Sequence, residues 1–114
     1  MSVPLYQAKA ELFRTLGHPA RIRVLELLQD GPKPVRDLLA DIDVEASNLS
    51  QQLAVLRRAG LVTSSRDGAL VMYALSSAQV AALLAAARGI LREVLDDRDG
   101  LRAQLRDDGT VRRA

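Results

Sequence analysis

The most informative segment of this sequence is VRDLLADIDVEASNLSQQLAVLRRAGLVTSSRDGALVMYAL, residues 35–75. We expect a short helix over 35–40, a turn, a second helix over 46–59, and a β-hairpin folded at Asp67-Gly68. In the second helix Leu49, Leu53 and Leu56 recur at spacings of four and three, so they share one face that turns toward the core. This order of elements predicts a helix-turn-helix followed by a hairpin.

The opposite face of the helix over 46–59 combines polar and basic side chains with no carboxylate; its residues are Ser47, Asn48, Gln51, Ala54 and Arg58. Such a face can enter a DNA major groove without repelling phosphate, and its amide and hydroxyl groups can bond to base edges. Asparagine and glutamine suit adenine, and arginine suits guanine or phosphate. We take this as the recognition helix; the alternative is a solvated face without a ligand.

Composition limits the class of protein. A chain of 114 residues with one Phe, two Tyr and no Trp predicts a single, mostly helical domain with an aliphatic core. The absence of cysteine excludes disulfides, thiolate metal sites and thiol redox sensing. There is no leader pattern and no apolar run of the ~20 residues that a membrane span needs, so we expect a cytoplasmic protein without a membrane partner.

Three further helices complete the domain. We expect one from residue 5 and a second over 19–29, with the longest helix over 76–95 capped by Ser76 or Ser77. The first and last helices carry more apolar surface than a small domain can cover, which predicts a second copy of the chain. The candidate dimerisation residues are Leu5, Leu12, Val80, Leu84, Ala87, Leu91 and Val94.

The remaining boundaries follow from composition. Residues 1–4 are expected to be a flexible N-terminus, 5–96 the folded domain, and 97–114 a charged, partly mobile tail with one or two helical turns. The hairpin strands are expected over 61–66 and 69–75. Alternation in the second strand predicts that Val71, Tyr73 and Leu75 pack on the helices.

Three motifs resemble the ArsR/SmtB family of winged helix-turn-helix regulators. They are LGHPARIRVL at 16–25, NLSQQLAVLRRAGLV at 48–62, and RDG at 66–68 with YAL at 73–75, and the match covers roughly residues 5–96. The resemblance implies a mainly α fold of about five helices with a small β-hairpin wing. It also implies a homodimer through the first and last helices that binds an inverted repeat in double-stranded DNA, as a repressor.

The resemblance also suggests roles by position. Ser47, Asn48 and Gln51 would meet base edges, and Arg66 at the wing would reach a minor groove or the backbone. The residues expected to contact phosphate or neighbouring structure are Gln52, Arg57 and Arg58. The chain departs from the family at two places: Glu45 replaces the usual Ser or Thr N-cap, and Ala69 replaces a basic wing residue. We therefore expect a weaker wing contact.

The metal-sensing sites of related proteins are not matched. Pro34 and Arg36 occupy the positions of a Cys-x-Cys pair, and only one carboxylate remains at the four ligand positions of the last helix, Ser77, Gln79, Ile90 and Glu93. The only imidazole, His18, precedes a proline at a helix junction, where a histidine usually has a structural role. His18 and Glu93 remain the candidate ligands for a nickel or zinc effector.

Other functions find less support. With one histidine, no cysteine and no glycine-rich phosphate loop, the sequence is not expected to encode an enzyme. The competing hypothesis is a dimeric interaction module that regulates through a co-regulator protein and binds DNA weakly or only in complex.

Overall fold

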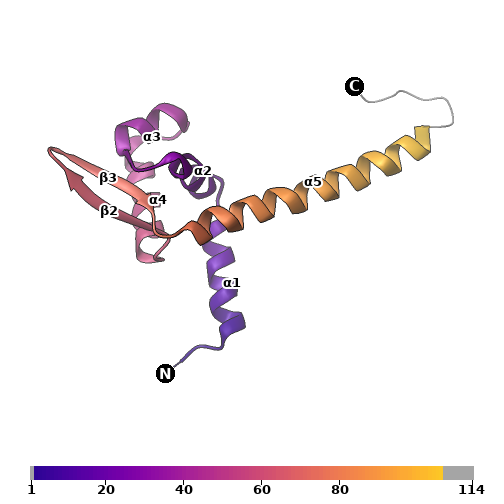
Figure 1. Cartoon of the computed structure of the whole chain (residues 1–114), viewed down its shortest axis with the longest axis horizontal. Coiled ribbons are helices and arrows are strands. Elements are labelled where there is room, and N and C mark those ends of the chain that lie inside the picture. The colour runs from indigo at the N-terminus through magenta and orange to yellow at the C-terminus, as the bar shows by residue number, and fades with distance from the viewer. Residues whose placement is uncertain (1, 107–114) are drawn as a thin grey trace. The chain divides into compact units, whose positions relative to one another are not determined.

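The computed structural model describes residues 2–106, with side chains described for residues 2–100. Its elements in order are α1 (Leu5–Leu16), α2 (Pro19–Leu27), the 3-10 turn η1 (Leu28–Asp30), β1 (Lys33–Pro34), α3 (Val35–Asp41), α4 (Ala46–Arg58), β2 (Val62–Asp67), β3 (Leu70–Leu75) and α5 (Ala78–Arg106) (Figure 1). The chain forms two compact units, which divide after Ala81. The predicted helix-turn-helix and hairpin are confirmed.

The core of the first unit lies among α2, α3 and α4. Its most buried side chains are 0 % exposed and are all aliphatic: Val24, Leu25, Leu38, Leu49, Leu53 and Leu56. Burial of each such side chain contributes about 1.5–3 kcal/mol. Three of the six form the predicted leucine stripe of α4, so burial of this stripe fixes which face of α4 points outward.

Local sequence sets the start of α2. Pro19 occupies its first turn, and the Nδ1 atom of His18 accepts a hydrogen bond from the backbone N–H of Ala20 at 3.2 Å. Proline lacks the N–H that would be unsatisfied at this position, and the imidazole satisfies the next free donor. The structural role predicted for His18 is confirmed.

The end of α4 is closed by a glycine. Gly60 has φ of 79°, its N–H donates to Arg57 O at 3.0 Å, and the N–H of Leu61 donates to Leu56 O at 3.0 Å. This pair of bonds is a Schellman motif, which satisfies two carbonyls at the helix end and needs a left-handed residue. The chain therefore leaves α4 and enters β2 after only a few residues.

The wing is a three-stranded antiparallel sheet in the order β1-β3-β2. Figure 1 shows β2 and β3 side by side as a hairpin, and β1 adds its two residues to β3 through the pair Lys33↔Tyr73. The sequence did not predict β1, because a segment of two residues, Lys33 and Pro34, is too short to show strand periodicity.

The turn of the hairpin differs from the prediction by one residue. Asp67 pairs with Leu70, so Gly68 and Ala69 are the two turn residues. Gly68 has φ of 64°, and among residues 2–106 no residue other than glycine has a positive φ. A turn with positive φ only at its first central position takes glycine there, as in type II′, whereas the predicted Asp-Gly turn would need it at both.

The prediction that Val71 packs on the helices is wrong. Val71 is 38 % exposed, whereas Tyr73 and Leu75 are partly buried. Val71 pairs with Arg66, one pair from the end of the hairpin. Alternation predicts the face of a strand, but it does not predict how far along the strand the helices reach.

α5 begins at a serine cap and is longer than predicted. Ser77 Oγ accepts from the N–H of Gln79 at 3.2 Å, which confirms the predicted cap. The helix continues to Arg106, through a segment expected to be mostly a tail, because Leu, Arg, Ala and Gln over 101–106 are strong helix formers. Within residues 2–106, none of the helices combines the length and apolar content that crossing a membrane requires.

Candidate nucleic-acid interface

The outward face of α4 is the centre of the candidate site. Ser47, Gln51, Ala54 and Arg58 are exposed, and Asn48 is half-buried. The first turn of α4 contains no acidic residue, and its last turn contains two arginines. Glu45, at the N-cap, makes no capping hydrogen bond through its side chain. The surface that α4 presents therefore changes from uncharged hydrogen-bonding groups to positive charge along its length.

Gln52 does not lie on this face. It is 8 % exposed, its Oε1 atom accepts from Arg21 Nε at 2.7 Å, and its Nε2 atom donates to Asn48 Oδ1 at 2.9 Å. Of the two roles predicted for Gln52, phosphate contact or contact with neighbouring structure, the structure shows the second. The sequence contains the signal for this burial, because Gln52 is three residues after Leu49 and four before Leu56 and so lies on the same face of the helix.

Three arginines supply positive charge near α4. Arg57 and Arg58 end α4, Arg66 lies on β2, and all three side chains are exposed. Within the described residues none of the three makes an ion pair or a side-chain hydrogen bond, in contrast to Arg14, Arg23 and Arg36. Their charge is therefore not neutralised inside the chain and can act on an external anion.

An open hollow lies between the end of α4 and β3. Its volume is about 370 Å³, and it is lined by Ser50, Ala54, Arg57, Arg58 and Tyr73. Ser50 and Tyr73 were not predicted as site residues. Ser50 lies in the sequence between the outward residues Asn48 and Gln51. Tyr73 comes from the wing, and only the fold brings it to α4.

The two candidate metal ligands, His18 and Glu93, lie in different units of the chain. Nδ1 of His18 is used in the cap of α2. A second hollow of about 390 Å³ is lined by His18, Asp41, Asp43 and Asn48 among others. Nevertheless, the described part of the chain contains no group of three or more His, Cys, Asp or Glu placed to hold an ion. Glu93 lies exposed on α5, in the second unit.

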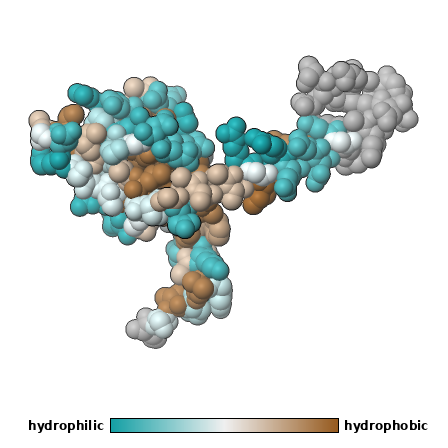
Figure 2. Space-filling view, in the orientation of Figure 1, coloured by the Kyte–Doolittle hydropathy of each residue, from teal (hydrophilic) through white to brown (hydrophobic). Residues whose placement is uncertain are grey.

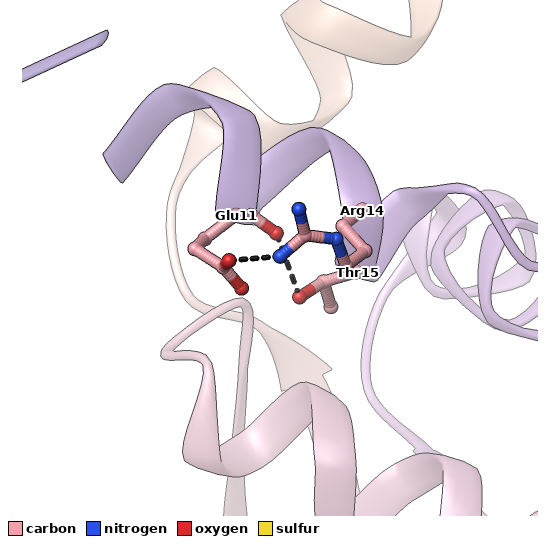
Figure 3. Close-up of polar contacts among 3 residues, drawn as sticks. All are labelled: Glu11, Arg14 and Thr15. Carbon is pink, nitrogen blue, oxygen red and sulfur yellow. Dashed lines mark hydrogen bonds and ion pairs between the residues drawn. The ribbon is translucent and has the colours of Figure 1, made fainter. Parts of the chain in front are cut away.

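The predicted dimerisation residues differ in exposure. On α1, Leu5 is 70 % exposed and Leu12 is half-buried, and apolar surface is visible along this helix in Figure 2. Phe13, which is 57 % exposed, adds to this surface. Polar groups on α1 satisfy each other: Arg14 pairs with Glu11, and Thr15 Oγ1 donates to Glu11 O at 3.1 Å (Figure 3).

On α5, one predicted dimerisation residue is not available to a partner. Val80 is only 7 % exposed because it packs inside the first unit. The prediction for Val80 is therefore wrong. Leu84 is half-buried and Ala87 is exposed, while Leu91 is 60 % and Val94 38 % exposed. The apolar face left open on α5 thus begins after its first turn.

Comparisons with known proteins agree with this geometry. The family model described as bacterial regulatory protein, arsR family, matches residues 18–64. The chain is 52 % identical over 111 residues to the HTH-type transcriptional regulator Rv0081 of Mycobacterium tuberculosis, with 96 % of this chain and 97 % of that protein covered. The crystal structure of Rv0081 matches with a TM-score of 0.79 at 55 % identity, covering 85 % of this chain and 98 % of that one.

Two further structures extend the comparison. The transcriptional repressor BigR from Xylella fastidiosa is 35 % identical with a TM-score of 0.69, covering 75 % of this chain and 87 % of that one. The homodimeric winged helix-turn-helix DNA-binding domain of Mb0332 from Mycobacterium bovis is 25 % identical with a TM-score of 0.71, covering 82 % and 89 %. Rv0081 and BigR are transcriptional regulators and not enzymes, and the Mb0332 domain is a DNA-binding domain. The chain belongs to the ArsR family of bacterial winged helix-turn-helix transcriptional regulators.

Proposed function

We propose that this regulator binds an inverted-repeat operator as a homodimer and represses transcription from that promoter. The observation that carries the proposal is the outward face of α4, which is free of carboxylates and ends in two arginines without an internal partner. A promoter-bound dimer blocks access of RNA polymerase, and BigR, one of the relatives, is a repressor. Acting on the chromosome places the protein in the cytoplasm.

Base contacts are assigned to the exposed N-terminal half of α4. Ser47, Asn48 and Gln51 follow one another along the outward side of the helix, and the N-terminal residues of a recognition helix are those that meet base edges. Hydroxyl and amide groups can donate to and accept from the major-groove edges of bases. Gln51 is the principal candidate, because it is exposed and its side chain makes no hydrogen bond within the described residues.

Backbone contacts are assigned to Arg57, Arg58 and Arg66. Their exposed guanidinium groups can neutralise phosphates, and each phosphate contact releases a counterion and makes binding salt-dependent. The hollow beside Arg57 and Arg58 offers space for a phosphate next to Ser50 and Tyr73. Arg66 lies two residues before Gly68, near enough to the wing tip to follow the DNA backbone.

The homodimer is assigned to α1 and α5. Leu5 and Phe13 on α1, with Leu91 and Leu95 on α5, are large apolar side chains at least half exposed in the single chain. Exposed apolar surface of this kind typically marks an interface, and the homodimeric Mb0332 domain shares the fold. A two-fold dimer presents two copies of α4, which requires half-sites about one helical turn (~34 Å) apart.

The described residues do not form a complete effector site for a metal ion. A nickel or zinc site requires several ligands around one point. His18 uses Nδ1 in its helix cap, and only Nε2 remains for a metal. Glu93 belongs to the other unit of the chain. A co-regulator protein is likewise not assigned.

The direct test is a gel-shift and footprint of the purified protein on the promoter regions flanking its own gene. We expect protection of an inverted repeat, with affinity that falls steeply as salt concentration rises. Binding that shows no protected site and does not distinguish this DNA from random duplex of the same length would contradict the proposal. The two half-sites should also be related by two-fold symmetry, because each subunit of an isologous dimer makes the same contacts with its own half-site.

A further inference from the structure

A chain of side-chain hydrogen bonds connects α2 with the outward face of α4. Arg21 Nε donates to Gln52 Oε1 at 2.7 Å, and Gln52 Nε2 donates to Asn48 Oδ1 at 2.9 Å. Arg21 is itself anchored, since its Nη1 atom donates to the backbone carbonyl of Thr15 at 3.2 Å. The link from Arg21 to Asn48 passes through Gln52, a side chain only 8 % exposed.

Arg21 fixes which atom donates and which accepts in the hydrogen bonds from Arg21 to Gln52 and from Gln52 to Asn48. A guanidinium group has donors and no acceptor, so the atom of Gln52 that faces Arg21 must be the amide oxygen. The Gln52 NH₂ group then faces Asn48, and Asn48 must turn its own oxygen toward it. The opposite orientation would place donors against donors at both contacts. Arg21 thereby sets the orientation of an asparagine amide that it does not touch.

The Asn48 NH₂ group remains for an external ligand. Its Nδ2 atom makes no hydrogen bond within the described residues. Among the described residues, every buried side-chain nitrogen or oxygen has a hydrogen-bond partner. Because Nδ2 of Asn48 has none, it cannot be buried and is open to solvent. Asn48 is half-buried between the exposed residues Ser47 and Gln51. Its accessible hydrogen-bonding group is therefore a donor.

We infer that Gln52 is a positioning residue that determines base preference by making Asn48 present its NH₂ group to DNA. This inference rests on the proposed function. An asparagine free to rotate can pair with adenine through both its oxygen and its NH₂ group. With the oxygen engaged by Gln52, Asn48 favours bases that offer acceptors, the O6 and N7 atoms of guanine or the O4 atom of thymine. Cytosine N4, a donor, is disfavoured, and adenine loses the partner for its N6 donor.

The test reverses the hydrogen-bond direction. In Gln52→Glu the carboxylate accepts from Arg21 with nearly the same shape, and its other oxygen can only accept from Asn48. The Asn48 amide must then turn, which presents its oxygen outward. Selection from randomised duplexes should show that the wild type prefers guanine or thymine at one position of each half-site. The variant should prefer adenine or cytosine there, a change of roughly tenfold in relative affinity.

Two matched variants separate this effect from a general effect of charge or stability. Gln29→Glu introduces the same charge at an exposed glutamine of η1, outside α4, and should leave the base preference unchanged. Arg21→Met removes the donor that fixes Gln52, so the preference at the Asn48 position should fall toward equality while preferences at other positions persist. Circular dichroism establishes that each variant is folded.

The outcomes distinguish this inference from the proposed function. If the wild type selects no sequence, the proposed function and this inference both fail. If the wild type selects a site but Gln52→Glu keeps the same base at every position, only the inference fails. Should Gln52→Glu not fold, Arg21→Met gives the answer, and an unchanged base preference in it overturns the inference.

A measurement on the wild-type protein without DNA provides a further check. In NMR the NH₂ protons of Gln52 should exchange slowly with water, because the group is buried and bonded to Asn48. The NH₂ protons of Asn48 should exchange at the rate of an exposed amide. Slow exchange at Asn48 with fast exchange at Gln52 would show the reverse orientation and overturn the inference.

Discussion

Arg21 on α2 and Gln52 on α4, separated by 31 residues in the chain, are joined by a hydrogen bond of 2.7 Å between Nε and Oε1. Gln52 is the one polar side chain among the buried residues that the structure describes. A buried polar group contributes to stability only while its partners are present. The bond therefore has consequences for folding that do not depend on DNA.

Arg21→Met should lower the free energy of unfolding by about 1–3 kcal/mol, because it leaves the buried Oε1 of Gln52 without its donor. Arg23→Met is the matched control: Arg23 is on the same helix, is half exposed, and pairs with Glu26 at 3.3 Å and with no other residue that the structure describes. Exposed pairs contribute little, so that variant should change stability by less than about 0.5 kcal/mol. Denaturant unfolding at one protein concentration measures both. Equal losses would contradict the assignment of Gln52 as a buried, Arg21-dependent group.

Two glycines should respond in opposite directions to substitution by alanine. Gly60 has φ of 79°, a left-handed conformation that costs an L-residue about 1–2 kcal/mol, so Gly60→Ala should be destabilising. Gly89 lies inside α5 with open space where a Cβ atom would be, so Gly89→Ala should stabilise by about 0.5–1 kcal/mol. Thermal unfolding of both variants and the wild type measures these changes in stability. Destabilisation at Gly89 would show that a contact not present in the single chain requires glycine there.

Arg58→Gln should weaken binding to every duplex by a similar factor and reduce the dependence of log K on log salt by about one unit of slope. The physical reason is the loss of one phosphate contact and its released counterion. Arg92→Gln, at an exposed position on α5, is the control and should leave the slope unchanged. Fluorescence anisotropy over a salt series measures the slope. A selective loss on the operator alone would instead make Arg58 a base-contacting residue.

Leu91→Glu should shift the protein from dimer to monomer in sedimentation. Leu91 is 60 % exposed in the single chain and lies on the same side of α5 as Leu84 and Val94, so a charge there would be buried in the proposed interface. Ala86→Glu places the same charge on another, exposed side of α5 and should leave the dimer intact. If Leu91→Glu stays dimeric while Ala86→Glu dissociates, the interface lies on a different side of the helix.

Periodicity predicted the elements that form the site. The spacing of Leu49, Leu53 and Leu56 placed α4 and its outward face correctly, because a regular helix converts spacing directly into direction. The same spacing places Gln52 inside the stripe, which favours the second of its two predicted roles, contact with neighbouring structure, over contact with phosphate. Its actual partner, Arg21, is distant in sequence, and no local pattern predicts that pair.

The remaining differences arise where tertiary structure decides. The observed hairpin turn is formed by Gly68 and Ala69, because Asp67 pairs with Leu70. The dipeptide Asp67-Gly68 had predicted the turn one residue earlier. Val80 is buried in the core of its own unit, although it follows the same three- and four-residue spacing as the exposed apolar residues of α5. Apolar spacing predicts a face, and which neighbour covers that face depends on the fold.

The most direct test of α4 as the recognition helix compares Gln51→Ala with the wild type on two duplexes, the selected operator and a random sequence of equal length. Gln51 is exposed and has no partner among the described side chains, so its loss should reduce operator affinity about tenfold or more and leave random-sequence affinity nearly unchanged. Gln79→Ala, at an exposed glutamine of α5, should affect neither duplex. Equal losses on both duplexes with Gln51→Ala, or no loss on either, would contradict base recognition by this face of α4.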